Sequence, residues 1–113
     1  MTISTHVLDT SIGRPAAAVD VRLYALQPDG RRQEIGRATT SADGRVSGFP
    51  AAAPIERAGM YSLQFDVGAY FRGRGVDSFY QLVTVDFVAA DPAAHYHVPL
   101  LLSPYGYSTY RGS

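Results

Sequence analysis

Two histidines stand two residues apart near the end of the chain, in the stretch His95-Tyr96-His97-Val98-Pro99. Alternate residues of a β-strand point to the same face, so both imidazoles are expected on one side of a sheet. Imidazole changes charge near neutral pH, which suits it to proton transfer, and it also binds metals such as zinc. Because no third metal ligand is identifiable nearby, the spacing favours proton transfer. We expect no metal and no other cofactor.

Three further positions have chemical potential but also an ordinary explanation. His6 lies between apolar and β-branched neighbours, where a histidine is commonly just part of a strand. Arg45 directly follows the Asp43-Gly44 turn, where an arginine is commonly solvated. Tyr110-Arg111 would usually belong to a frayed chain end. The serines show no Ser-His-acid order and the chain has no cysteine, so no covalent nucleophile is predicted.

Alternating apolar and polar residues predict the strands that would position these side chains. In residues 60–67 the face expected to enter the core carries Tyr61, Leu63, Phe65 and Val67. The same pattern predicts strands over residues 5–9, 19–26, 34–40, 79–88 and 95–102, and a return strand over residues 107–111 after the turn Ser103-Pro104-Tyr105-Gly106.

The remaining segments are predicted to be short or irregular. Residues 46–49 form at most a brief strand, and residues 50–54, three alanines between two prolines, form an irregular connection. Residues 68–72 are expected to make one helical turn, which ends at Gly73 and Gly75. Short antiparallel strands without long helices predict a β-sandwich. The pattern alone does not choose among sandwich topologies, the immunoglobulin-like one included.

The length and charge of the chain limit its partners. Its 113 residues suit one domain, residues 1–113, with one hydrophobic core. Ten arginines balance ten acidic residues without a basic stripe, so neither nucleic acid nor membrane is an expected partner. The first residues lack a secretion signal, no apolar run reaches membrane-spanning length, and no cysteine demands an oxidising compartment. We therefore expect a cytoplasmic protein.

Both ends of the chain carry motifs of a known family. His-Tyr-His-Val-Pro-Leu-Leu-Leu-Ser-Pro from residue 95, with Tyr-Arg-Gly-Ser at residues 110–113, resembles the C-terminal signature of the 5-hydroxyisourate hydrolases, or transthyretin-related proteins. Ser-Thr-His-Val-Leu-Asp-Thr at residues 4–10, with Gly-Arg-Pro at residues 13–15, resembles their N-terminal signature. The resemblance implies an all-β fold, a transthyretin-like β-sandwich of two four-stranded sheets with one short helix.

The resemblance also implies a reaction and its residues. The family hydrolyses 5-hydroxyisourate to 2-oxo-4-hydroxy-4-carboxy-5-ureidoimidazoline in urate (purine) degradation. By motif position the implied catalytic residues are His6, Arg45, His97 and Ser113. The residues implied to shape the substrate-binding pocket are Tyr110, Arg111 and Gly112. No catalytic role follows for His95, for which packing or support is expected.

Opening a cyclic amide needs a base that takes a proton from water and a group that stabilises the tetrahedral oxyanion. We assign the base to His97, with His6 positioning water or substrate, although residue type does not rank the two. Arg45 offers a permanent cation and a planar donor fork, and it would keep nearby imidazoles neutral. Ser113 would add a hydroxyl and, at the chain end, a carboxylate.

The resemblance further implies a homotetramer, a dimer of dimers with the sites at the dimer–dimer interface. The strand faces with His6, His97 and Tyr110 would line its channel. Consistent with this, His6 shares its face with Leu8, and His97 shares its face with Leu101, opposite the core. Two alternatives stay open: a transthyretin-like carrier of a small ligand without catalysis, and a β-sandwich interaction module. The carriers lack the histidine and arginine set and the terminal motif.

Overall fold

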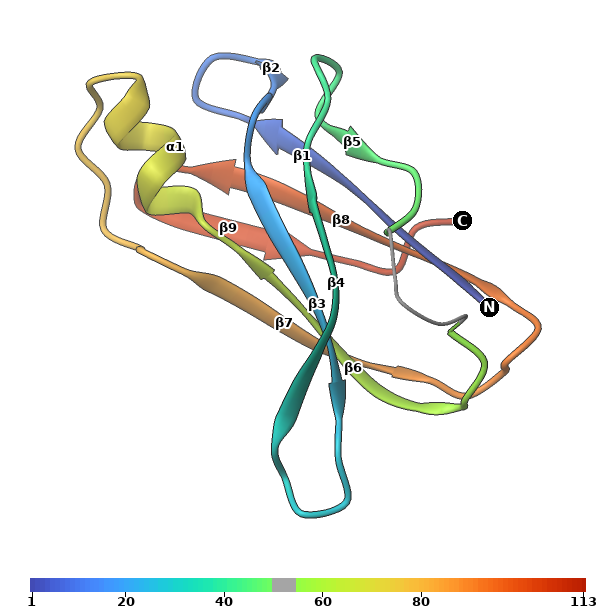
Figure 1. The fold of residues 1–113 in the computed structure, drawn as a ribbon. Helices are drawn as coiled ribbons and strands as arrows, with labels where there is room; N and C mark the ends of the chain where they lie inside the picture. Colours follow the sequence, from blue (N-terminus) through green and yellow to red (C-terminus); the bar gives the residue numbers. More distant parts are fainter. Residues whose placement is uncertain (50–54) are drawn as a thin grey trace.

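Two β-sheets pack against each other in the computed structural model, which describes residues 1–49 and 55–113 (Figure 1). The first sheet runs, in spatial order, through β2 (Arg14–Pro15), β1 (Thr2–Asp9), β8 (His95–Ser103) and β9 (Gly106–Thr109), with β5 (Arg45–Val46) also paired to β1. The second runs through β4 (Arg32–Thr39), β3 (Asp20–Leu26), β6 (Gly59–Phe65) and β7 (Val83–Ala89). This confirms the predicted sandwich of two sheets. The first sheet has β5 as a fifth strand in addition to the four predicted.

The core lies between the sheets and is built by the alternation read from the sequence. Val7 of β1 and Leu100 of β8 face Leu23 of β3 and Leu63 of β6, and all four are fully buried. Each such aliphatic side chain stabilises the fold by about 1.5–3 kcal/mol relative to an exposed position. The opposite face of β8 is therefore free to carry the imidazoles.

The predicted strand over residues 60–67 is too long by two residues. β6 ends at Phe65, and Asp66 caps the helix α1 (Val67–Gly73) by accepting a hydrogen bond from the Ala69 amide at 3.1 Å. Val67 is buried as predicted, but it enters the core from the helix. The predicted helical turn over residues 68–72 is confirmed. No helix in the described part of the chain is long and apolar enough to cross a membrane.

Two other predicted strand segments are shorter in the structure. β7 begins at Val83 and not at residue 79, because the Phe79 amide donates to the Pro104 carbonyl at 2.8 Å and so leaves the ladder. Of residues 46–49, only Val46 belongs to a strand. The irregular connection predicted for residues 50–54 lies outside the described residues.

The chain end departs from the predicted strand in an informative way. β9 ends at Thr109, two residues early, where Pro99 of β8 has no amide hydrogen to donate. The Pro99 carbonyl instead accepts a hydrogen bond from the Thr109 hydroxyl at 2.6 Å. Pairing resumes at His97, whose carbonyl accepts from the Gly112 amide at 2.8 Å. The tail is therefore held along β8 and does not fray.

A buried carboxylate ties the end of β1 to α1. Asp9 is 1% exposed, and its Oδ1 accepts hydrogen bonds from the amide and the hydroxyl of Ser11 at 3.0 and 2.5 Å. Its Oδ2 accepts from the Tyr70 hydroxyl at 2.8 Å. Burial, together with the Asp9 carboxylate, raises the pKa of Tyr70 to about 12, so this hydroxyl stays protonated and can donate.

Tyr70→Phe should lower the free energy of unfolding by about 1.5–3 kcal/mol, because a buried carboxylate loses one of its donors. Urea unfolding monitored by circular dichroism measures this change. The control is Tyr24→Phe, whose hydroxyl reaches Gln64 only at 3.4 Å and should matter by less than about 0.5 kcal/mol. Equal stability of the Tyr70 variant and the unchanged protein would contradict the role given to this contact.

Candidate functional site

The strand pairing of the first sheet brings the N-terminal and C-terminal motifs together. β1 runs parallel to β8, which places Ser4 opposite His97 and Thr2 opposite His95. β5 runs antiparallel to the other edge of β1 and places Arg45 opposite His6. Residues more than 90 positions apart in the sequence are thus fixed beside each other by backbone hydrogen bonds.

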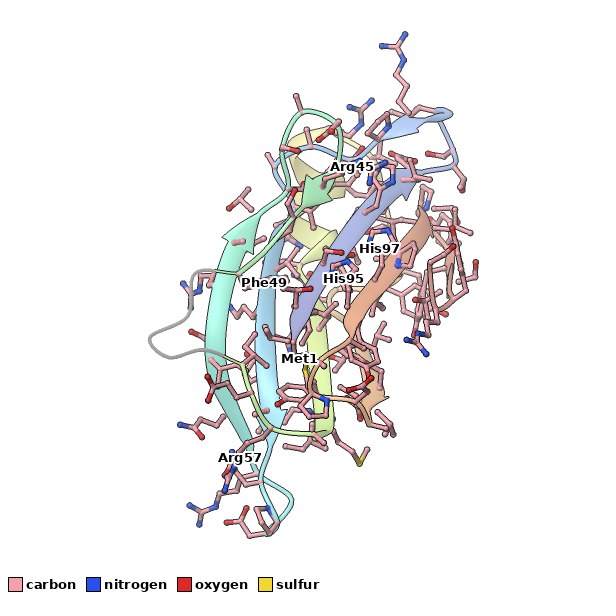
Figure 2. All side chains as sticks on the ribbon, turned by 90° about the vertical axis from the view of Figure 1, so that its right-hand side faces the viewer. Met1, Arg45, Phe49, Arg57, His95 and His97 are labelled. Carbon is pink, nitrogen blue, oxygen red and sulfur yellow. The ribbon has the colours of Figure 1, made fainter. Side chains whose placement is uncertain are left out.

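A pocket of about 310 Å³ opens on this face of the sheet. Figure 2 shows Arg45, His95 and His97 on one side of the molecule, on strands that flank β1. Of the predicted catalytic residues, Arg45, His97 and Ser113 line the pocket. The other lining residues are Ser4, Thr5, Val46, Ser47 and His95. This volume is at the lower end of the range for small-molecule sites.

His6 lies beside this pocket but not in its wall. Its Nε2 donates a hydrogen bond to the Asp43 carbonyl at 2.9 Å, since a carbonyl can only accept. When His6 is neutral, its Nδ1 is therefore the nitrogen left as an acceptor. The Asp43-Gly44 turn is fixed against β1 because the Gly44 carbonyl accepts from the Val7 amide at 2.8 Å.

Gly44 is required at this turn for two reasons. Its φ of +79° lies in the left-handed region, which residues with a Cβ avoid. A Cβ at this position would also lie 2.4 Å from the Val7 carbonyl oxygen. Glycine therefore allows the turn to approach β1 closely enough for Arg45 to pair with His6.

The ring of His97 is held on two sides. Its Nδ1 lies 2.7 Å from the Ser4 hydroxyl. On the other side, a Cβ built on Gly112 would come within 2.5 Å of His97 Cδ2, so only glycine fits beside the imidazole. Among the contacts of residues 1–49 and 55–113, no hydrogen bond engages His97 Nε2, which leaves that nitrogen for water or substrate.

Burial lowers the pKa of His97, and the Arg45 cation, then His95 and His6, lower it further. His97 is therefore neutral at pH 7 and suited to accept a proton. Because its ordinary pKa of 6.5 applies to the unfolded chain, unfolding binds a proton as the pH falls through that range. His97 therefore lowers the free energy of unfolding at acid pH, and this effect disappears above about pH 7.

The predicted substrate-binding residues divide between two places in a single chain. Gly112 contacts His97, as described above. Tyr110 and Arg111 instead line a groove of about 290 Å³ that reaches from β7 to β8 and β9. The Arg111 guanidinium lies 4.8 Å from the centre of the Tyr96 ring, a cation–π contact. Contact of Tyr110 and Arg111 with substrate stays a prediction.

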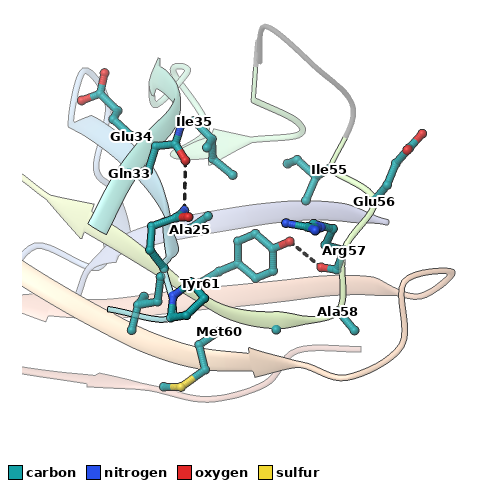
Figure 3. A pocket seen from close by; sticks show the side chains of 14 residues that line it. Ala25, Gln33, Glu34, Ile35, Ile55, Glu56, Arg57, Ala58, Met60 and Tyr61 are labelled. Atoms are coloured by element: carbon teal, nitrogen blue, oxygen red, sulfur yellow. Dashed lines mark hydrogen bonds between the residues drawn. The ribbon is translucent and has the colours of Figure 1, made fainter. Parts of the chain in front are cut away.

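Another cavity, of about 670 Å³, is larger than the pocket at His97 (Figure 3). It is bounded by the β3–β4 hairpin and by residues 55–61, with Tyr61 donating a hydrogen bond to the Arg57 carbonyl at 2.5 Å. The described lining residues include no histidine. Size alone therefore does not make this cavity the better candidate for hydrolysis.

The sequence reading missed Ser4 as a site residue. Its hydroxyl lies between the His97 and His95 rings, at 2.7 and 3.0 Å from one nitrogen of each. The strand predicted over residues 5–9 did not include Ser4, whereas β1 begins at Thr2, and only the parallel register shows which residues of β8 lie opposite. Within the described residues, no group of three His, Cys, Asp or Glu side chains gathers as a metal site would require.

The two sheets and this polar pocket define a small transthyretin-like sandwich equipped for proton transfer. The HIUase/Transthyretin family model matches residues 3–112, and the chain belongs to that family. The 5-hydroxyisourate hydrolase 2 of Rhizobium meliloti (strain 1021) is 50% identical, over 98% of this chain and 95% of that protein.

Two solved structures extend the comparison. The 5-hydroxyisourate hydrolase of Klebsiella pneumoniae has a TM-score of 0.85 and 40% identity and covers 100% of both chains. Sea bream transthyretin, solved in complex with thyroxine, has a TM-score of 0.86 and 30% identity and covers 99% of this chain and 95% of that one. The fold is therefore shared by an enzyme and by a protein that holds a small ligand.

Arg45→Gln should raise the pKa of His97 toward its ordinary value, because it removes the neighbouring charge with the largest effect on this pKa. An NMR titration of the His97 ring measures the shift. Arg31→Gln is the matched control, since Arg31 is an exposed arginine whose ion pair is with Asp29 in the β3–β4 turn. An unchanged His97 pKa in the Arg45 variant would show that the Arg45 cation does not contribute to lowering it.

Proposed function

We propose that this chain is a single-domain hydrolase that converts 5-hydroxyisourate to 2-oxo-4-hydroxy-4-carboxy-5-ureidoimidazoline in urate degradation. The observation that carries the proposal is the pocket in which Arg45 and a neutral His97 meet beside Ser113. The names of the Rhizobium meliloti and Klebsiella pneumoniae relatives support the choice of substrate. We propose the cytoplasm as its setting, because a chain without cysteine needs no oxidising compartment.

The reaction adds water across a carbonyl–nitrogen bond of the six-membered ring. In our mechanism His97 Nε2 takes a proton from water while the water oxygen bonds to the carbonyl carbon. The tetrahedral intermediate then collapses, the carbon–nitrogen bond breaks, and the ring nitrogen receives the proton from His97. Water thereby supplies the hydroxyl of the new carboxyl group and the hydrogen of the new N–H bond, and no covalent intermediate with the protein is needed.

Arg45 has the electrostatic task in this mechanism. Half of its side chain is exposed, and its ion pair with Asp43 is long, at 3.7 Å, so the guanidinium is free to turn toward substrate. Its planar donor fork suits the carbonyl oxygens of the substrate and the negative charge that develops on one of them. His6, fixed by the Asp43 carbonyl, is assigned to positioning water or substrate through Nδ1. Ser113 is assigned to hydrogen bonding at the pocket wall.

The alternative is a carrier of a small ligand, as the thyroxine complex of sea bream transthyretin illustrates. A site for an apolar ligand is expected to have mainly apolar walls. The pocket described here instead has Arg45, two histidines and three serines in its wall. Polar walls of this kind favour a substrate rich in carbonyl and N–H groups, and therefore the hydrolase.

His97→Asn and His6→Asn should each lower kcat by roughly 100-fold or more, the scale of lost general acid–base catalysis. The measurement is a spectrophotometric assay with freshly generated 5-hydroxyisourate, corrected for its spontaneous decay. Arg31→Gln, remote from the pocket, should retain full activity. If the wild-type protein did not accelerate the decay, the proposed function would be wrong. If both histidine variants kept near wild-type activity, the roles assigned to His97 and His6 would be wrong.

Gly112→Ala should lower kcat by at least about tenfold, because the new methyl group displaces the His97 ring and a misplaced catalytic group is costly. Gly73→Ala is the control, since a Cβ there meets no atom within 4 Å. Both variants should unfold cooperatively at similar urea concentrations. Full activity of Gly112→Ala would show that the tight fit of the tail does not position His97.

We also propose a homotetramer, a dimer of dimers of about 49 kDa, four times the 12.2 kDa chain. Its support is the set of large apolar side chains left exposed in one chain, among them Val88 at 63%, Tyr105 at 69% and Tyr107 at 43%. Light scattering coupled to size exclusion should give this mass. A monodisperse, fully active monomer would contradict a site shared between chains.

A further inference from the structure

A single hydroxyl group joins the two histidines of β8. Ser4 Oγ lies 2.7 Å from His97 Nδ1 and 3.0 Å from His95 Nε2, and the two rings stack with their centres 6.5 Å apart. The other nitrogen of His95, Nδ1, is hydrogen-bonded to the Thr2 hydroxyl. Ser4 is only 7% exposed, whereas Thr2 and His95 are exposed. A continuous hydrogen-bonded chain thus leads from His97 to the protein surface.

The proton count along this chain links the tautomers of its members. The Ser4 hydroxyl has one hydrogen, so it donates to one imidazole and accepts from the other. If it donates to His95 Nε2, His97 must carry its hydrogen on Nδ1, and His97 Nε2 is an acceptor. If it donates to His97 Nδ1, then His97 Nε2 carries the hydrogen and cannot take a proton from water.

Only the first arrangement is compatible with His97 as the base, and it needs an unprotonated Nε2 on His95. His95 then carries its hydrogen on Nδ1, which faces a Thr2 hydroxyl able to accept it. The same arrangement serves the step after proton transfer. The imidazolium of His97 keeps its Nδ1–H bond to Ser4, and Ser4 still has His95 as its acceptor.

We propose that Ser4 and His95 are positioning residues that hold His97 in the Nδ1–H tautomer and so keep its Nε2 available as the base. Neither residue takes part in bond making, and the inference rests on the proposed function for the role of His97. The geometry assigns His95 a definite task, to accept the Ser4 hydrogen. General support or packing would place no demand on the protonation of its ring.

The test measures the tautomer of His97 independently of the hydrolysis rate. Long-range ¹⁵N–¹H NMR of the substrate-free protein, at mildly alkaline pH, reports which nitrogen of His97 carries hydrogen. The unchanged protein should show a protonated Nδ1 and a bare Nε2 for His97. Ser4→Ala and His95→Ala should lose this fixed pattern and show Nε2–H or a mixture. In the hydrolysis assay both should lose kcat by roughly tenfold, the effect of one hydrogen bond to a group that becomes charged, with KM little changed.

His95→Gln is the matched variant, because its amide oxygen can accept the Ser4 hydrogen without an imidazole. It should restore the His97 tautomer and most of kcat relative to His95→Ala. Ser78→Ala, in the segment between α1 and β7, controls for loss of a serine elsewhere. His95 is exposed, so its variants should fold even if Ser4→Ala does not.

Each outcome has a separate meaning. An Nε2–H tautomer of His97 in the unchanged protein would overturn the proposal, and so would His95→Ala and Ser4→Ala variants with an unaltered tautomer and kcat. If the unchanged protein failed to hydrolyse 5-hydroxyisourate but the NMR pattern responded as expected, the tautomer chain would stand and the proposed function alone would fall.

Discussion

The parallel pairing of β1 with β8 is the constraint on which the site depends. In this ladder the register is fixed over eight residue pairs, from Thr2 with His95 to Asp9 with Leu102. A shift by one residue would turn Ser4 to the other face of the sheet and would expose Val7, which is fully buried. The hydrophobic core therefore enforces the alignment that the polar face uses, and packing between the sheets sets the hydrogen bond between Ser4 and His97.

Pro99 shows how one residue can shape both the fold and the site. Lacking an amide hydrogen, it interrupts the β8–β9 ladder, and the Thr109 hydroxyl satisfies its carbonyl. The register is nevertheless recovered at His97 and Gly112. The tail beyond β9 is thus close enough to press against the His97 ring, yet the missing ladder bond at Pro99 leaves Tyr110 and Arg111 outside regular pairing.

Period-two alternation was enough to predict most strands and the core face of β8, because both are local properties of the chain. It extended the predicted strand to Val67, although β6 ends at Phe65. Asp66 caps a helix there, which the alternation of polar and apolar residues does not reveal. It also could not show that β1 and β8 are parallel, because register between distant segments depends on the packing of the whole sandwich. The family motifs indicated His6, Arg45, His97 and Ser113, but Ser4 needed the register itself.

His6 and His97 offer opposite nitrogens, and the reason lies in their backbone surroundings. His6 is next to a turn whose Asp43 carbonyl can only accept, so His6 holds its hydrogen on Nε2 and leaves Nδ1 open. His97 faces a neighbouring strand with a hydroxyl at Ser4, which engages Nδ1 and leaves Nε2 open. A hydroxyl, unlike a carbonyl, does not choose the tautomer by itself. The direction of the hydrogen bond at His97 is therefore set by the other members of the hydrogen-bonded chain, His95 and Thr2.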